Sequence, residues 1–195
     1  MRHSCVAPPS DAERTPDAAT RTMLRIRDVT PADAEAIVAI LNPIIAARVY
    51  TIFDTPFTVE AEREFIRGFP ARGVFHVAAD EASGDVVGFQ NVEPVVDYTR
   101  ALDHVGSIGT YVAPGHRRHG VASRLFEATF AAARHKRYEK LFTFVRADNP
   151  AALATYQRHG FRVVGTAERH ARIDGRYVDE VIIERRLDRS VEKTG

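Results

Sequence analysis

Residues 109–122 read GTYVAPGHRRHGVA, and this stretch indicates more about the fold than any other. Residues 105–112 have the apolar content of a strand, Pro114-Gly115 ends it, and apolar side chains recur at helical spacing from Val121. The first backbone N–H groups of a helix have no intrahelical partner and carry partial positive charge, so they favour an anion such as a pyrophosphate. The stretch therefore predicts a strand, a basic loop and a helix that together can hold a phosphate group.

The loop has the side chains that such a role needs. Arg117 and Arg118 can donate ionic hydrogen bonds, and Gly120 and Ala122 leave room for a phosphate to approach the backbone. Residues 117–140 contain seven Lys and Arg against two Glu, so positive charge is concentrated here. The alternative interpretation is a solvated basic connection between the strand and the helix. The cationic side chains near the C-terminus of the helix would then be explained by the helix dipole alone.

Strand and helix patterns alternate outward from this unit. Their order is strand, two helices, three strands, helix, strand, helix and two strands, which indicates one α/β domain with a mixed sheet and helices on both faces. We expect strands at 24–29, 74–79, 86–92, 105–112, 141–145, 161–167 and 177–183. We expect helices from Pro31 until Asn42-Pro43 disrupts the pattern, over 58–68, from Val121, and from Pro150 to Gly160.

The folded domain should span residues 23–187. Residues 1–22 contain prolines and small residues but no cluster of large apolar side chains, so they predict a tail that cannot offset its own ordering entropy. Met23 directly precedes the first expected strand and is the alternative start of the chain. Residues 188–195 predict a short C-terminal tail.

The composition excludes several classes of function. The chain has 195 residues and a formal net charge of +1, which argues against whole-surface attraction to nucleic acid or an anionic membrane. Its one cysteine, Cys5, excludes an intramolecular disulfide and a multi-thiolate metal site. His116 and His119 flank two arginines, whose charge opposes a metal dication, so we expect no metal. No apolar run approaches the roughly 20 residues of a membrane-spanning helix, and we expect a soluble cytoplasmic protein.

A second motif lies at residues 146–161, which read RADNPAALATYQRHGF. With the loop, this motif makes the chain resemble the GNAT superfamily of N-acetyltransferases. The loop matches the superfamily's (Arg/Gln)-x-x-Gly-x-(Gly/Ala) signature for acyl-CoA, and the second stretch matches its Asn-x-x-Ala-x-x-x-Tyr-x-x-x-Gly-Phe pattern. The matching residues are Arg117, Gly120 and Ala122 in the loop, and Asn149, Ala152, Tyr156, Gly160 and Phe161 in the second motif.

The resemblance covers residues 23–187 and implies a particular architecture. This is the GNAT fold, a central and mostly antiparallel sheet with helices on both faces, in which strands 4 and 5 splay apart. Within the superfamily, the chain is similar to the branch of phosphinothricin and L-amino-acid N-acetyltransferases. The similarity to this branch lies in Asn42, the Thr51–Pro56 loop and residues 172–179.

The resemblance also implies roles for individual residues. Val112 should bind the pantetheine arm of acetyl-CoA through its main chain, Asn149 should contact the cofactor near its thiol end, and Tyr156 should protonate the departing CoA thiolate. The pyrophosphate should be bound by Arg117, Arg118, His119, Gly120, Val121, Ala122 and Ser123. Without the motif, Tyr156 would be interpreted as a core tyrosine on the inner face of its helix, beside Leu153.

The general base departs from the pattern of that branch. Related phosphinothricin-type sequences have a glutamate at the position of Ser107, whereas residues 107–110 of this chain include no acid. Glu93, at the end of the preceding strand, and His104 are the substitutes to test. Their alternative interpretations are a solvent-facing acid at a strand end and a loop histidine.

These features predict an N-acetyltransferase that moves an acetyl group from acetyl-CoA to a primary amine of a small molecule, either an amino acid or an analogue. Cys5 lies in the expected tail, so transfer should be direct, in a ternary complex without an acyl-enzyme. A non-catalytic module that binds CoA or nucleic acid through the 117–140 face is the alternative. The acceptor pocket should be built from residues 44–58 and 167–177, and the aromatic residues near it equally suit packing or a homodimer contact.

Overall fold

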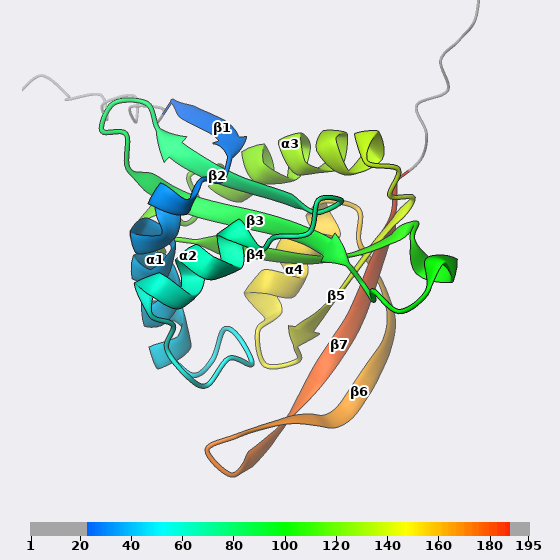
Figure 1. The fold of residues 1–195 in the computed structure, drawn as a ribbon. Helices are drawn as coiled ribbons and strands as arrows, with labels where there is room; N and C mark the ends of the chain where they lie inside the picture. Colours follow the sequence, from blue (N-terminus) through cyan, green and yellow to red (C-terminus); the bar gives the residue numbers. More distant parts are fainter. Residues whose placement is uncertain (1–22, 188–195) are drawn as a thin grey trace, which may run out of the picture.

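The computed structural model describes residues 23–187, which form one seven-stranded sheet covered by helices (Figure 1). The expected tails at 1–22 and 188–195 lie outside the described residues. The strands are β1 (Leu24–Asp28), β2 (Val74–Asp80), β3 (Val86–Pro94), β4 (Val105–Val112), β5 (Lys140–Arg146), β6 (Arg162–Ile173) and β7 (Arg176–Arg186). The α-helices are α1 (Ala34–Ala46), α2 (Val59–Arg67), α3 (Val121–His135) and α4 (Pro150–Arg158).

The sheet opens between β4 and β5. The strand order is β1-β2-β3-β4-β5-β7-β6, and every neighbouring pair is antiparallel except β4 with β5. These two strands pair in parallel from Val105–Ser107 with Lys140–Phe142 and then part. Beyond Ser107, β4 pairs with β3 alone in the described sheet, which confirms the expected splayed pair of strands 4 and 5.

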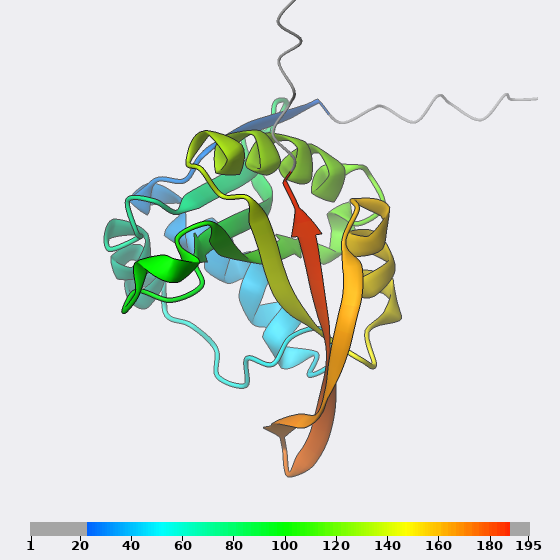
Figure 2. The same ribbon diagram turned by 90° about the vertical axis from the view of Figure 1, so that its right-hand side faces the viewer.

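Helices cover both faces of the sheet, as the alternating patterns predict (Figure 1). One core lies under α1 and α2, and a larger core lies under α3 and α4. Figure 2 shows α3 across the top of the domain and the β6–β7 hairpin extending beyond the helices. No helix among residues 23–187 is long and apolar enough to cross a membrane.

The first helix corrects one expectation. The Asn42-Pro43 pair predicts an earlier end, but α1 continues through it to Ala46. Proline removes the intrahelical hydrogen bond to the carbonyl of Ala39, and because both residues are exposed, water can bind that carbonyl. Ile44 and Ile45 are buried in the core, and their burial favours one further helical turn.

Apart from β6 and β7, the remaining boundaries agree closely with the sequence patterns. Gly84 in the β2–β3 turn and Gly160 after α4 have left-handed φ angles of +81° and +80°, as a turn and a helix C-terminus require. β6 and β7 are longer than expected and meet at the Asp174-Gly175 turn.

Candidate active site

Two adjoining cavities lie where β4 and β5 part. The larger has a volume of about 560 Å³ and the smaller about 310 Å³, which is the size range of small-molecule sites. The residues that line both cavities are Tyr50, Thr110, Tyr111, Ala152 and Tyr156. Because they share this wall, a ligand in one cavity can contact a ligand in the other.

The larger cavity is built by the strand–loop–helix unit of residues 109–122. Gly120 precedes α3 with a left-handed φ of +81°, and the first turn of α3 contains no acidic residue. The residues expected to bind the cofactor that do line this cavity are Val112, Arg117, Arg118, Gly120, Val121, Ala122, Ser123 and Asn149. His119 is exposed and lies outside this lining. The helix N–H groups and the two guanidinium groups together suit an anionic ligand.

Tyr50 reaches the basic loop from the segment after α1. The Arg117 guanidinium lies 4.3 Å from the centroid of the Tyr50 ring, which is cation–π geometry. Tyr50 lines both cavities, whereas Arg117 lines only the larger one, so this contact fixes the Arg117 side chain against the wall of the larger cavity. No local pattern predicts this contact, because the two residues are distant along the chain.

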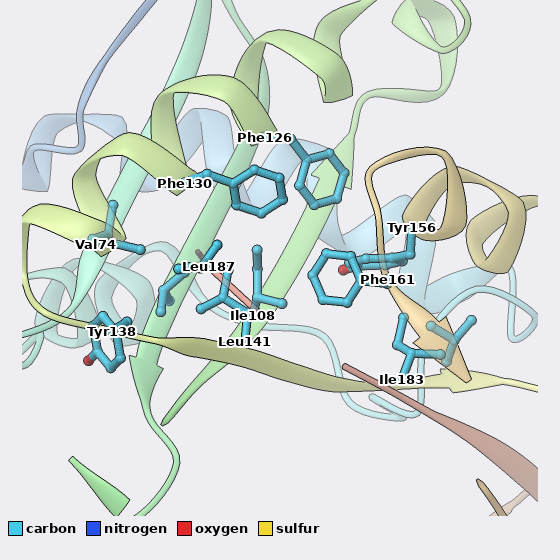
Figure 3. Close-up of a cluster of buried hydrophobic side chains, with 13 residues drawn as sticks. Val74, Ile108, Phe126, Phe130, Tyr138, Leu141, Tyr156, Phe161, Ile183 and Leu187 are labelled. Carbon is cyan, nitrogen blue, oxygen red and sulfur yellow. The ribbon is translucent and has the colours of Figure 1, made fainter. Parts of the chain in front are cut away.

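Tyr156 lies on the inner face of α4 and is 8% exposed (Figure 3). Its ring meets Phe161 edge to face, with 5.0 Å between centroids. Its hydroxyl donates a hydrogen bond to Thr110 Oγ1 at 3.0 Å. Burial raises the pKa of Tyr156 well above its ordinary value, and the bond with Thr110 opposes this shift. Tyr156 is therefore both a packed core residue and part of the wall of both cavities, so the two interpretations of the sequence are compatible.

Asn149 lines the larger cavity but its amide is already engaged. Its Oδ1 accepts a hydrogen bond from the Ala152 backbone N–H at 3.2 Å, which caps the start of α4. Its Nδ2 donates to the Tyr50 carbonyl at 3.4 Å. In this structure Asn149 thus joins α4 to the segment that follows α1.

Glu93 and His104, the two candidate bases, lie in different places. Glu93 lines the smaller cavity directly across the β3–β4 ladder from Ser107. Asn91 Nδ2 donates to Glu93 Oε1 at 2.8 Å, and burial raises the pKa of this carboxyl group. His104 is exposed at the opposite end of β4 and lines neither cavity, because the strands open only after Ser107. The structure thus retains Glu93 and removes His104 as a candidate.

The smaller cavity corrects the expected acceptor pocket in part. Residues 50–53 line it, which agrees with the expected contribution of 44–58. No residue of 167–177 lines it, although the tip of the β6–β7 hairpin lies beside the segment after α1, where Asp174 pairs with Arg48 at 3.5 Å. In place of the hairpin, the wall contains residues 143–146 of β5 and Glu180 of β7.

Arg146 and Glu180 are the functional candidates that the sequence interpretation missed. Arg146 makes a two-pronged ion pair with Asp148, at 2.8 and 2.7 Å, and donates to the carbonyls of Arg48 and Thr51. Glu180 is 3% exposed, and burial raises the pKa of its carboxyl group. The Arg-x-Asp spacing at 146–148 could have indicated the ion pair, but the position of Glu180 depends on its pairing with Arg146 across β5 and β7.

The described residues contain no candidate site for a metal ion. Among residues 23–187, no group of three or more His, Cys, Asp or Glu side chains is placed to hold a metal ion.

Comparison with known proteins places this geometry in context. The family model described as "Acetyltransferase (GNAT) family" matches residues 46–161, which include both motifs. YwnH of Bacillus subtilis (strain 168) is 31% identical over 156 residues, covering 80% of this chain and 94% of YwnH. The phosphinothricin N-acetyltransferase of Streptomyces coelicolor is 28% identical over 168 residues, covering 84% and 96% of the two chains. The solved structure of a phosphinothricin acetyltransferase from Sinorhizobium meliloti in complex with AcCoA has a TM-score of 0.77 at 20% identity, over 84% of this chain and 88% of that one.

Proposed function

Because the chain belongs to the GNAT family of acetyltransferases, we propose that it moves an acetyl group from acetyl-CoA to a primary amine of a small molecule. One observation supports this most: the basic loop, the opening of β4 from β5 and the Tyr156 phenol meet at two adjoining cavities. The larger cavity suits the acyl-CoA and the smaller suits the amine. The Streptomyces coelicolor relative is named for phosphinothricin, so amino acids and their analogues are one class of acceptor to test.

The larger cavity fits acetyl-CoA by its chemistry. Arg117 and Arg118 are positioned for the pyrophosphate, together with the backbone N–H groups of residues 120–123. Val112 lies at the end of the β4 segment that has no β5 partner, so main-chain groups there are free for the amides of the pantetheine arm. The bound thioester supplies the activated acetyl group.

Glu93 is the residue that we assign to remove a proton from the amine. An alkyl amine with a pKa near 10.4 is almost entirely protonated at pH 7, so a nearby base is needed before its nitrogen can attack. The half-buried Glu93 carboxylate lines the acceptor cavity, and its raised pKa makes it a better base than an exposed glutamate. Glu93 pairs across the β3–β4 ladder with Ser107, the position at which related sequences have a glutamate.

Tyr156 is assigned the opposite task, protonation of the departing thiolate. With ordinary pKa values of 10 for tyrosine and 8.5 for a thiol, this transfer is uphill by about 2 kcal/mol. Burial raises the pKa of Tyr156 further, but it also disfavours a thiolate formed beside it, so burial acts on both partners of the transfer. The main-chain N–H groups of β4 that have no partner on β5 would stabilise the negative charge that develops on the acetyl oxygen.

Calorimetric titration followed by a thiol-release assay tests this function against a non-catalytic module that uses the 117–140 face. We expect acetyl-CoA to bind, RNA not to bind, and CoA thiol to appear only when a primary amine is present. Tight binding of acetyl-CoA or RNA without thiol release from a broad mixture of amines would support the non-catalytic module instead.

A further inference from the structure

The smaller cavity, which the proposed function assigns to the amine, is lined by two glutamates and one arginine. We infer that its acceptor is a linear diamine or polyamine, a primary amine whose second charged group is another ammonium and not an α-carboxylate. This inference rests on the proposed function and specifies the substrate class of the same site. It follows from two carboxylates in the wall and from the state of the one arginine beside them.

Two glutamates contribute negative charge to the smaller cavity from separate strands. Glu93 comes from β3 and Glu180 from β7, on opposite sides of the gap between β4 and β5. Glu93 accepts from the neutral Asn91 amide, and His170 Nε2 lies 3.9 Å from a Glu180 oxygen. Burial raises the pKa of the Glu180 carboxyl group more than the charge of Arg146, opposite it across β5 and β7, lowers that pKa, and the two residues form no ion pair. Neither glutamate therefore has an arginine or lysine salt bridge that would cancel its charge in the described structure.

Arg146 is the only lysine or arginine among the described residues that line this cavity. A guanidinium has five N–H donors. Four of those of Arg146 are used, two by Asp148 and two by the carbonyls of Arg48 and Thr51. An α-carboxylate in the cavity would find a guanidinium that is already paired with Asp148 and would meet two carboxylates of like charge, which is costly in a partly buried site.

The geometry suits a molecule with two ammonium groups joined by methylenes. Glu93 is in register with Glu184 through Ser107 and Phe142, so Glu180 lies four residues further along β7. Three strand spacings of about 4.8 Å and a rise of about 3.3 Å per residue along the strand put the two glutamate backbones on the order of 20 Å apart, and their side chains shorten that span from both ends. Ile52, Phe53 and Phe144 provide apolar wall between them, against which methylenes can pack. The reacting ammonium would lose its proton to Glu93 while the distant ammonium pairs with Glu180.

Matched substrate pairs test the inference on the wild-type enzyme. Putrescine differs from ornithine, and cadaverine from lysine, only by the α-carboxylate. We expect kcat/KM to be at least about tenfold higher for each diamine than for its amino acid, and higher for putrescine than for n-butylamine, which lacks the second charge. Equal or faster acetylation of ornithine, lysine or phosphinothricin would overturn the inference and leave the proposed function intact. Thiol release with none of these amines, despite binding of acetyl-CoA, would overturn the proposed function itself.

A charge-removing variant tests the assigned role of Glu180. In Glu180→Gln, we expect the ratio of kcat/KM for putrescine to that for n-butylamine to fall about tenfold. Both rates come from one preparation, so any loss of folded protein cancels in the ratio. Glu168→Gln removes the same charge from an exposed position on β6 outside the cavity and should keep the wild-type ratio. An unchanged ratio in Glu180→Gln would contradict the pairing of the second ammonium with Glu180.

Discussion

The hydroxyl of Tyr156 on α4 lies 3.0 Å from the hydroxyl oxygen of Thr110 on β4. Gln90, which is fully buried on β3, donates to the same Thr110 oxygen at 2.7 Å. Both Thr110 and Tyr156 line the two cavities, so this chain of polar groups ends where the acetyl group would be transferred. Thr110 accepts from the phenol here and is thus placed to orient it, and the Thr110 hydroxyl must rotate to donate to the phenol oxygen once the proton has left.

Tyr156→Phe should separate acid catalysis from cofactor binding. The variant keeps the ring and its edge-to-face contacts with Phe126 and Phe161, but it removes the acidic proton. General acid catalysis contributes about 10²- to 10⁴-fold, so we expect kcat to fall by at least about 100-fold while the Kd of acetyl-CoA stays within about threefold. Steady-state kinetics and calorimetry measure the two quantities, and an unchanged kcat would remove Tyr156 from the mechanism.

Thr110→Val should slow the reaction only through Tyr156. Loss of the hydroxyl removes the hydrogen-bond partner of the phenol, and we expect kcat to fall about tenfold and Thr110→Ser to restore most of it. In a double-mutant cycle, Thr110→Val should have no further effect in the Tyr156→Phe background, because the group on which it acts is absent. Additive effects of the two substitutions would show that Thr110 acts elsewhere.

Glu93→Gln should change the pH dependence of kcat/KM. With a base in place, the productive complex contains deprotonated Glu93 and a protonated amine, so wild-type kcat/KM should rise through the pKa of Glu93 and then level off. Burial raises that pKa above the ordinary glutamate value, which moves the rise toward neutral pH. The variant can react only with the neutral form of the amine, so its kcat/KM should rise about tenfold per pH unit up to the pKa of the amine. A plateau retained in Glu93→Gln would identify another base.

Arg117→Ala should weaken acetyl-CoA binding more than it slows the chemical step. Hydrogen bonds to charged groups contribute about 1.5–3 kcal/mol, so we expect the KM of acetyl-CoA to rise about 10- to 100-fold with kcat within about fivefold. Arg124→Ala is the matched control, since Arg124 belongs to the same basic segment but is exposed and lines neither cavity. Equal effects of the two variants would indicate a diffuse electrostatic role of residues 117–140 in place of a local phosphate site.

Glu62→Gln should stabilise the protein at neutral pH. Glu62 on α2 is 5% exposed, and burial raises its pKa in the folded state above the unfolded value. The wild type therefore has its full stability from this group below the ordinary glutamate pKa and loses it as pH rises through the raised value. We expect the Tm of Glu62→Gln to exceed that of the wild type at pH 7.5 and to match it near pH 4. A difference in Tm that is the same at both pH values would contradict this linkage.

The sequence predicted the fold well where local patterns determine it. Gly120 begins α3 and Gly160 follows α4 in the left-handed conformation, because glycine alone adopts it without strain, and these turns delimit the two motifs. The resemblance of the second motif to the GNAT superfamily implied that Tyr156 reaches the site, and Tyr156 lines both cavities. Pro43 predicts a helix end, and this prediction is wrong. The burial of Ile44 and Ile45 stabilises the last turn of α1, and that burial depends on tertiary packing.

The charge of the acceptor cavity could not be predicted in the same way. Glu180 enters the wall through its cross-strand pairing with Arg146, and Arg146 pairs with Asp148 and donates to carbonyls more than ninety residues earlier in the chain. Such pairings join segments that are remote in sequence, so no local pattern reports them. For the same reason, the sequence could not distinguish Glu93 from His104 as the candidate base, because that choice depends on where β4 and β5 part.

A single-turnover experiment tests whether the acetyl group passes directly from acetyl-CoA to the amine. Enzyme in excess over acetyl-CoA would be mixed with putrescine, quenched at intervals, and analysed by mass spectrometry for acetylated amine and acetylated protein. The account predicts that acetylated putrescine appears at the rate at which CoA thiol is released, and that acetylated protein does not accumulate at any time. Acetylated protein that forms before the amine product, or CoA released without any acetylated amine, would contradict direct transfer in this site.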